Sequence, residues 1–224
     1  MKRLGIGLIE LVISIVIIGM VMMSIPMLIM ESEENDEYSI LQETILANRT
    51  KLAQIMTYRW DENAVEPLTG IIRIVDTLGD SDLNRSVSNK RAGNVIKNFR
   101  RKMLDTPTFA TMAVDGLDDI DDFNGQNSQV VFQEATASQG MGYKNRNFNL
   151  LVNVQYISDS ANYNNPTISF SFDASATSPT STNIKMITLD TLFASVDNRT
   201  NIPFRFRAFA CNIGSIQLEE RRYE

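Results

Sequence analysis

The residues with the clearest chemical potential are carboxylates, and they gather in two places. Residues 6–30 form an apolar run that contains a single acid, Glu10. A carboxylate within a membrane-length apolar segment is costly without a partner, so Glu10 is a functional-site hypothesis by itself. Farther along, residues 115–124 hold five aspartates and one asparagine in ten positions. Crowding of like charges on this scale is unfavourable unless water or a cation relieves it.

The acidic loop, residues 115–125, allows two interpretations. Calcium prefers carboxylate and carbonyl oxygens on a flexible loop, and Gly116 and Gly125 permit tight turns. The ligands of such a structural calcium would be Asp118, Asp119, Asp121, Asp122 and Asn124. The spacing is not that of an EF-hand, because Ile120 stands where an aspartate is required. The alternative, which the sequence favours, is a solvated loop or helix cap that holds no cofactor.

The composition excludes several kinds of active site. The chain has no histidine, which removes histidine-based triads, metal sites and general bases. It also has no phosphate-binding loop and no nucleophile motif, so we expect it not to be an enzyme. The only cysteine, Cys211, lies in an apolar, strand-like stretch and is predicted to be a buried structural thiol.

The N-terminal segment has the length and flanks of a membrane anchor. Residues 6–30 can span a bilayer as a helix, with Lys2 and Arg3 before them and an acidic run after them. The positive-inside rule places the N-terminus in the cytoplasm and the remainder outside the membrane. A secretory signal peptide would have a shorter apolar core, followed by a small-residue cleavage site that is not found here.

A short basic leader ends in Gly5 and is followed by Ile6, and Glu10 lies at the fifth position counted from Ile6. With this spacing, the first thirty residues resemble the type IV pilin and type II secretion pseudopilin family, in which Ile6 would begin the mature chain. Gly19 also matches a glycine that is usual in this family. There are two departures, since phenylalanine is commoner than isoleucine at the first mature position and Pro26 falls one place early. The resemblance is specific over these residues and weaker beyond them.

The resemblance implies a processing and assembly pathway. A prepilin peptidase would cut between Gly5 and Ile6 and methylate the new amine of Ile6. Glu10 would then meet the positive N-terminus of a neighbouring subunit, an ion pair that fixes axial register in a low-dielectric bundle. Pro26 would kink or locally melt the helix, because it removes one helical hydrogen bond.

The periodicity predicts an α+β fold, and the resemblance implies a pilin-like order of its elements. One helix is expected over residues 6–59, bent near Pro26, and its second half carries an amphipathic stripe that would pack on a sheet. Alternating residues predict an antiparallel sheet. Its expected strands are residues 70–75, 148–156, 168–172, 184–189 and 204–208. The segments are a leader (1–5), a transmembrane or filament-core helix (6–30), its amphipathic continuation (31–66) and a β-rich head (67–224).

Two further segments carry minor hypotheses. Residues 90–104 are predicted to form a second helix with a strongly basic face, which could contact DNA phosphates or anionic lipid. The net charge of −6 argues against general nucleic-acid binding, so a solvated face is the favoured interpretation. Asp82 to Ser86 fits an extended bacterial N-glycosylation sequon centred on Asn84, a short pattern that often arises by chance.

Together these features predict a minor pilin or pilin-like structural subunit of a type IV pilus-like filament. The acidic run resembles that of minor pilins of the mannose-sensitive haemagglutinin type. The alternatives are a pseudopilin of a type II secretion system and a membrane-anchored DNA- or surface-binding module. The expected partners are the prepilin peptidase, other pilin or pseudopilin subunits and inner-membrane lipid. The expected location is the inner membrane, single-pass with a periplasmic head, and an extracellular filament after assembly.

Overall fold

The computed structural model describes residues 7–85, 91, 102–130, 147–158, 160–169, 171, 173–193 and 204–215. The chain divides into two compact units, Met1–Ala47 and Asn48–Glu224. The first unit consists of most of one long helix, and the second contains the end of that helix and a β-sheet. This is an α+β arrangement, as the sequence predicts.

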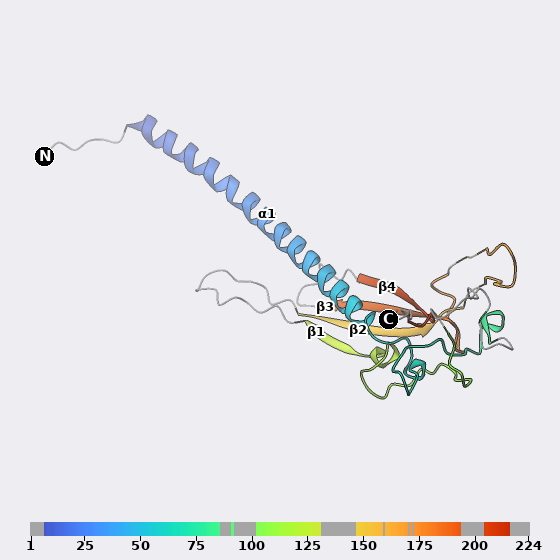
Figure 1. Ribbon diagram of the computed structural model, residues 1–224. Helices are drawn as coiled ribbons and strands as arrows, with labels where there is room; N and C mark the ends of the chain where they lie inside the picture. Colours follow the sequence, from blue (N-terminus) through green and yellow to red (C-terminus); the bar gives the residue numbers. More distant parts are fainter. Residues whose placement is uncertain are drawn as a thin grey trace, which may run out of the picture. The chain divides into compact units, whose positions relative to one another are not determined.

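Helix α1 (Leu8–Ile55) is 48 residues long and is drawn as an unbroken ribbon in Figure 1. It continues on both sides of Pro26, which lies inside the helix. The kink at Pro26 stays a prediction. The helix ends four residues before the predicted Arg59, because the backbone tightens: the amides of Thr57 and Tyr58 donate to carbonyls three residues earlier, at 3.1 and 3.0 Å.

The apolar part of α1 is long enough to cross a membrane. The most apolar window of Leu8–Ser32 has a mean hydropathy of 2.6, and none of that window is buried within the structure. Large side chains such as Leu8, Met23 and Met27 are more than 70% exposed. A helix that is apolar on all sides needs lipid or other helices around it.

The sheet has four antiparallel strands in the order β1-β2-β3-β4 (Figure 1). They are β1 (Asn127–Val130), β2 (Phe148–Tyr156), β3 (Ile184–Phe193) and β4 (Phe204–Cys211). Along β2, buried residues alternate with half-buried ones, which confirms the predicted single core face. Val152 pairs with Leu189, and Leu189 pairs with Phe206, so this core face continues across three strands.

The core of the second unit lies between the last turns of α1, the loop that follows and the sheet. Leu52 and Ile55 of α1 pack with Val152, Val154 and Leu189, as expected for the amphipathic stripe. The acidic loop contributes Phe123, whose ring meets Tyr58 edge-on, with centroids 4.8 Å apart. These contacts attach the acidic loop to the sheet through apolar burial.

Several predicted elements are wrong in their described residues. Residues 70–75 form only isolated bridges, Ile72 to Val65 and Ile74 to Met103, instead of a strand. Residues 168, 169 and 171 are not in a strand, and Ile168 is 51% exposed. Alternation alone cannot build a strand, since each strand also needs a partner that accepts its backbone hydrogen bonds.

The predicted helix over residues 90–104 lies mostly outside the described residues. At its ends, Arg91 bridges Arg85 and Met103 bridges Ile74 in β geometry, so the helix does not extend to these positions. Conversely, the polar strand β1 was not predicted, because its sequence Asn-Ser-Gln-Val carries no apolar alternation. Its residues form a strand because they pair with β2.

Cys211 is exposed, which corrects the prediction of a buried thiol. Neighbouring side chains of a strand point to opposite faces, and Ala210 occupies the buried position at the end of β4. Cys211 therefore shares the exposed face of Arg205 and Arg207.

Candidate functional sites in the apolar helix and the acidic loop

The polar side chains of the apolar segment share one face of α1. These are Glu10, Ser14 and Ser24, and at about 100° per residue they fall within an arc of about 80°. The serine hydroxyls are satisfied within the helix, since Ser14 donates to the carbonyl of Glu10 at 2.7 Å and Ser24 to that of Val21 at 2.8 Å. Glu10 is exposed on this face, and its carboxylate is free to meet a group from another molecule. The processing positions Gly5 and Ile6 lie outside the described residues.

In the acidic loop, the Asp122 carboxylate serves as an internal acceptor. Its Oδ1 accepts the backbone amides of Asp115 and Gly116 at 3.1 and 3.2 Å. Its Oδ2 accepts those of Asp118 and Asp119 at 2.8 and 3.1 Å. Four N–H donors thus occupy the lone pairs of one buried carboxylate, and they fold the loop around it.

The Asp119 carboxylate has a similar role within the same loop. Its Oδ1 accepts the amides of Asp121 and Asp122 at 2.9 and 3.3 Å, and its Oδ2 accepts the amide of Glu62 at 2.7 Å. The last contact joins the loop to the short helix η1 (Glu62–Ala64), just after the end of α1. The hydrogen bonds of Asp119 and Asp122 therefore fix the conformation of the loop. Backbone N–H dipoles also stabilise the negative charges of these two carboxylates, which offsets part of their mutual repulsion.

The remaining predicted calcium ligands are also engaged. Asp118 pairs with Arg59, and the Asn124 Oδ1 accepts the amide of Val154 at 3.0 Å. Oxygens of Asp115, Asp118 and Asp122 do lie within 4.8 Å of one another. However, the Asp122 oxygens already accept four hydrogen bonds, and a calcium ion would have to displace them. These hydrogen bonds favour an internally satisfied loop over a calcium site, and calcium binding stays a prediction.

We expect calcium to leave the thermal stability of the protein unchanged. The test measures the unfolding temperature of the detergent-solubilised chain in millimolar calcium and in excess chelator. Two curves within about 1 °C of each other agree with an internally hydrogen-bonded loop, since even modest ligand binding raises the unfolding temperature. A calcium-dependent rise of several degrees that Asp118→Asn abolishes would instead support a metal site.

The hydrogen bonds to Asp122 make the head sensitive to acid. Burial disfavours the charged carboxylate, but the four backbone N–H donors outweigh burial and lower the pKa of Asp122 from 3.8 to about 2. A depressed pKa adds stability above about pH 4, and that stability is lost as the pH falls towards 2. The contribution is about 2 kcal/mol.

The measurement compares the wild-type chain with Asp122→Asn between pH 2 and pH 6. We expect the wild-type chain to have the higher free energy of unfolding at pH 6, with the difference shrinking below pH 4. Asp118→Asn is the matched control, because Asp118 is exposed and should give a small difference. A wild-type advantage that is constant over this range would contradict the role assigned to Asp122.

A buried lysine, which was not predicted from the sequence, lies beneath the acidic loop. Lys185 is fully buried in β3, and its Nζ donates to the carbonyl of Trp60 at 2.7 Å. The same nitrogen contacts a carboxylate oxygen of Asp121 and lies 3.4 Å from Oδ2 of Asp61. The one signal in the sequence was a lysine within the otherwise uncharged run of residues 184–189.

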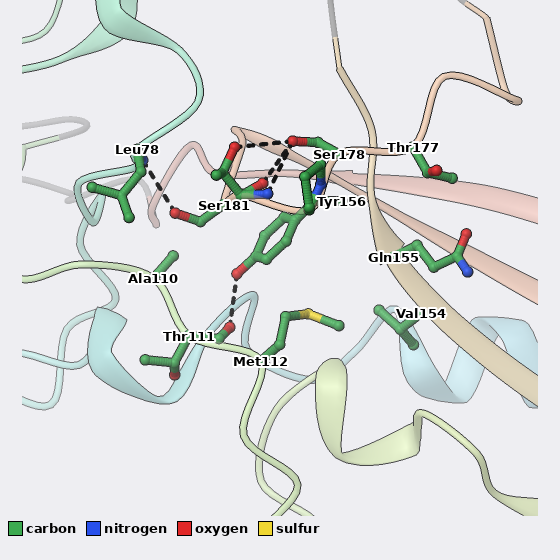
Figure 2. Close-up of a pocket in the computed structure, with 12 residues that line it drawn as sticks. Leu78, Ala110, Thr111, Met112, Val154, Gln155, Tyr156, Thr177, Ser178 and Ser181 are labelled. Atoms are coloured by element: carbon green, nitrogen blue, oxygen red, sulfur yellow. Dashed lines mark hydrogen bonds between the residues drawn. The ribbon is translucent and has the colours of Figure 1, made fainter.

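A surface cleft of about 590 Å³ lies beside this cluster (Figure 2). Its lining is apolar and neutral polar, and includes Leu78, Met112, Tyr156 and Ser181. The Tyr156 hydroxyl points across it and donates to the carbonyl of Thr111 at 2.7 Å. Among the described residues, those that line the cleft carry no charged side chain.

The predicted glycosylation position, Asn84, is exposed on the structure. Exposure is needed for modification but does not imply it, so glycosylation of Asn84 stays a prediction.

Comparison with protein-family models, with curated proteins and with solved structures finds no match to this chain.

Proposed function

We propose that the chain is a minor pilin-like subunit of a type IV pilus-like filament that is assembled from the inner membrane. The observation that carries the proposal is the exposed apolar stretch of α1, in which Glu10, Ser14 and Ser24 share one face. This stretch belongs to the same helix that ends in the core of the β-sheet unit. A single element thus supplies both a membrane segment and the support of a head.

Physical chemistry favours assembly over simple anchoring. An anchor needs no ionisable side chain, and a carboxylate in the hydrocarbon is costly unless it finds a cation. Cleavage after Gly5 would create such a cation at Ile6 of each subunit. Glu10 of one subunit would pair with the amine of the next, and the hydroxyl face of Ser14 and Ser24 would lie between the packed helices.

The head suits a structural subunit better than an enzyme. The carboxylates of Asp119 and Asp122 accept backbone hydrogen bonds, and Tyr156 is the only titratable residue among the described residues that line the surface cleft. Burial and the nearby aspartates raise the pKa of Tyr156 well above its usual range, so this phenol stays protonated. These features support a role in which the head provides shape and stability.

The first alternative is a pseudopilin of a type II secretion system, which would use the same leader cleavage and the same pairing of Glu10. The two roles differ in where the protein is found after assembly. Recovery in sheared surface filaments would favour the pilus. Retention in the envelope, together with a defect in protein secretion on deletion, would favour the pseudopilin. The DNA-binding alternative rests on residues 90–102, which lie mostly outside the described structure.

The deciding experiment is mass spectrometry of the native N-terminus. We expect a chain that begins at Ile6 and carries one added methyl group, about 14 Da, on its amine. Gly5→Leu, expressed in parallel, should accumulate with its leader attached. A native chain that begins at Met1, or one cut after residue 30, would overturn the proposal.

A further inference from the structure

We propose that Lys185 and Asp121 condense to an intramolecular amide, a covalent cross-link between strand β3 and the acidic loop. The inference rests on the arrangement of one buried amine, one incompletely bonded carboxyl and one further acid. It does not depend on the function proposed above, because it concerns the head alone.

The reacting groups are held together away from water. The side chain of Lys185 is 0% exposed and that of Asp121 is 1% exposed, and Nζ of the lysine touches Oδ1 of the aspartate. The rings of Trp60 and Tyr156 flank the amine, with centroids 4.4 and 5.5 Å from Nζ. Two groups fixed in this way react as one molecule, which can correspond to effective concentrations of about 10⁵ M or more.

The hydrogen bonds single out Asp121 among the neighbouring acids. The Asp61 carboxylate accepts the backbone amide of Asn63 on Oδ1 at 3.0 Å and that of Thr111 on Oδ2 at 2.9 Å. Asp119 holds three backbone amides. The buried Oδ2 of Asp121 has no hydrogen-bond partner within the described structure. Asp61 and Asp119 thus accept backbone N–H donors on both carboxylate oxygens, whereas Oδ2 of Asp121 accepts none within the described structure.

The protonation state of Asp121 suits condensation. Burial raises its pKa from 3.8 to about 7, although the charge of Lys185 and its hydrogen bond act in the opposite direction. In a desolvated pair, transfer of one proton from the ammonium to the carboxylate gives a neutral amine and a carboxylic acid, so that neither group has to be buried as an ion.

The reaction balances without any added reagent. Nζ of Lys185 contacts Oδ1 of Asp121, so its proton can pass directly to that carboxylate, and Oδ2 of Asp61, 3.4 Å from Nζ, is a second acceptor that can draw a proton from the amine. The lone pair of Nζ then attacks Cγ of Asp121 and forms the C–N bond. The C–O bond to the protonated oxygen breaks, and this hydroxyl takes a second proton from the nitrogen and leaves as water. The ammonium–carboxylate pair thus becomes one amide and one water.

The product would fit its surroundings better than the ion pair does. The amide keeps a single N–H, and the carbonyl of Trp60 at 2.7 Å from Nζ is positioned to accept it. One oxygen of Asp121 leaves with the water, so the buried carboxyl no longer has to satisfy two oxygens. The cross-link would also close a long loop between residues 121 and 185, which restricts the unfolded chain.

The test is the mass of the purified full-length chain in detergent, followed by tryptic mapping. We expect a deficit of about 18 Da, one water, relative to the sequence mass. Trypsin should fail to cut at Lys185, and residues 103–144 should be recovered covalently joined to residues 147–199. Fragmentation should locate the new bond between Lys185 and Asp121.

Four variants make the result specific. Lys185→Arg should restore the full mass, because a guanidinium is not nucleophilic at neutral pH. Lys51→Arg, a lysine whose Nζ lies over the ring of Phe123, should keep the deficit. Asp121→Asn should lose ammonia, about 17 Da, and give the same cross-linked product as the wild type. Asp61→Asn should slow the reaction and leave a mixture of masses.

One side reaction would give the same loss of about 18 Da as the proposed amide, but it can be distinguished chemically. The Asp115–Gly116 pair can cyclise to a succinimide with loss of one water, but mild alkali reopens it, whereas an amide survives. The proposal is overturned if wild-type protein has its full mass and is cut at Lys185, or if the deficit maps to Asp115. In either case Lys185 is an ion-pair partner only. Because the wild-type mass decides the question, a variant that fails to fold does not obscure it.

Discussion

Glu10→Ala is expected to remove the chain from filaments while leaving the head folded. In the proposed assembly, Glu10 neutralises the amine of a neighbouring Ile6 in a low-dielectric helix bundle. Removing one partner of a buried ion pair leaves the other charge unpaired, at a cost of about 3–5 kcal/mol. That cost corresponds to a fall in incorporation of more than about a hundredfold.

The measurement is the ratio of the subunit in sheared surface filaments to the subunit in membranes, determined by quantitative immunoblot. Glu10→Gln should behave like alanine, because it also lacks the charge, whereas Glu10→Asp should keep some of the incorporation. Ser14→Ala is the matched control, since it lies on the same face but its hydroxyl is satisfied within its own helix. Normal incorporation of Glu10→Gln would show that the charge of Glu10 is not required.

Lys185→Met is expected to produce the largest loss of stability of any single change in the head. The substitution keeps the volume but removes the only cation in contact with Asp121 among the described residues, and a buried carboxyl is left without its partner. The expected loss is about 3–5 kcal/mol, whether the wild-type contact is an ion pair or an amide. For a unit of this size, it would lower the unfolding temperature by roughly 10 °C.

Thermal unfolding of the detergent-solubilised chain, followed by circular dichroism, provides the measurement. Lys51→Met is the control, and it should change the unfolding temperature by no more than about 2 °C because Lys51 is only half-buried. The double variant Lys185→Met/Asp121→Leu should recover some of the loss, because it removes the orphaned carboxyl together with its partner. Equal stability of Lys185→Met and the wild type would contradict the importance of the cluster.

The regions of the fold that sequence reasoning predicted correctly are those governed by local patterns. The length and apolarity of residues 8–32 specify a membrane-length helix, because nearly every residue of the segment carries the same signal. Strand β2 was predicted within its observed bounds, since nine alternating residues leave one assignment only. Residues 168–172 had the same alternation but fewer positions, and no neighbouring strand pairs with their described residues.

The hydrogen bonds of the acidic loop could be predicted from the sequence only in part. Its composition indicated crowded carboxylates and suggested either solvent or calcium as the relief. The structure shows a third way of relieving the charge crowding, since backbone amides from the loop and from η1 stabilise the negative charge of Asp119 and Asp122. Hydrogen-bond partners close in sequence, such as Asp118 and Asp122, were within reach of inference. The contact of Asp119 with Glu62 spans 57 positions and was not.

The sequence by itself determined the membrane-length apolar helix, its lone acid Glu10 and the order of a helix followed by a sheet, because these depend on composition and period along one segment. Only the tertiary structure decided which carboxylates are buried and which cation meets them. Lys185 and Asp121 lie 64 positions apart, and they meet because strand pairing and core packing bring β3 beneath the acidic loop. Long-range contacts of this kind depend on the register of the whole sheet, which no local pattern contains.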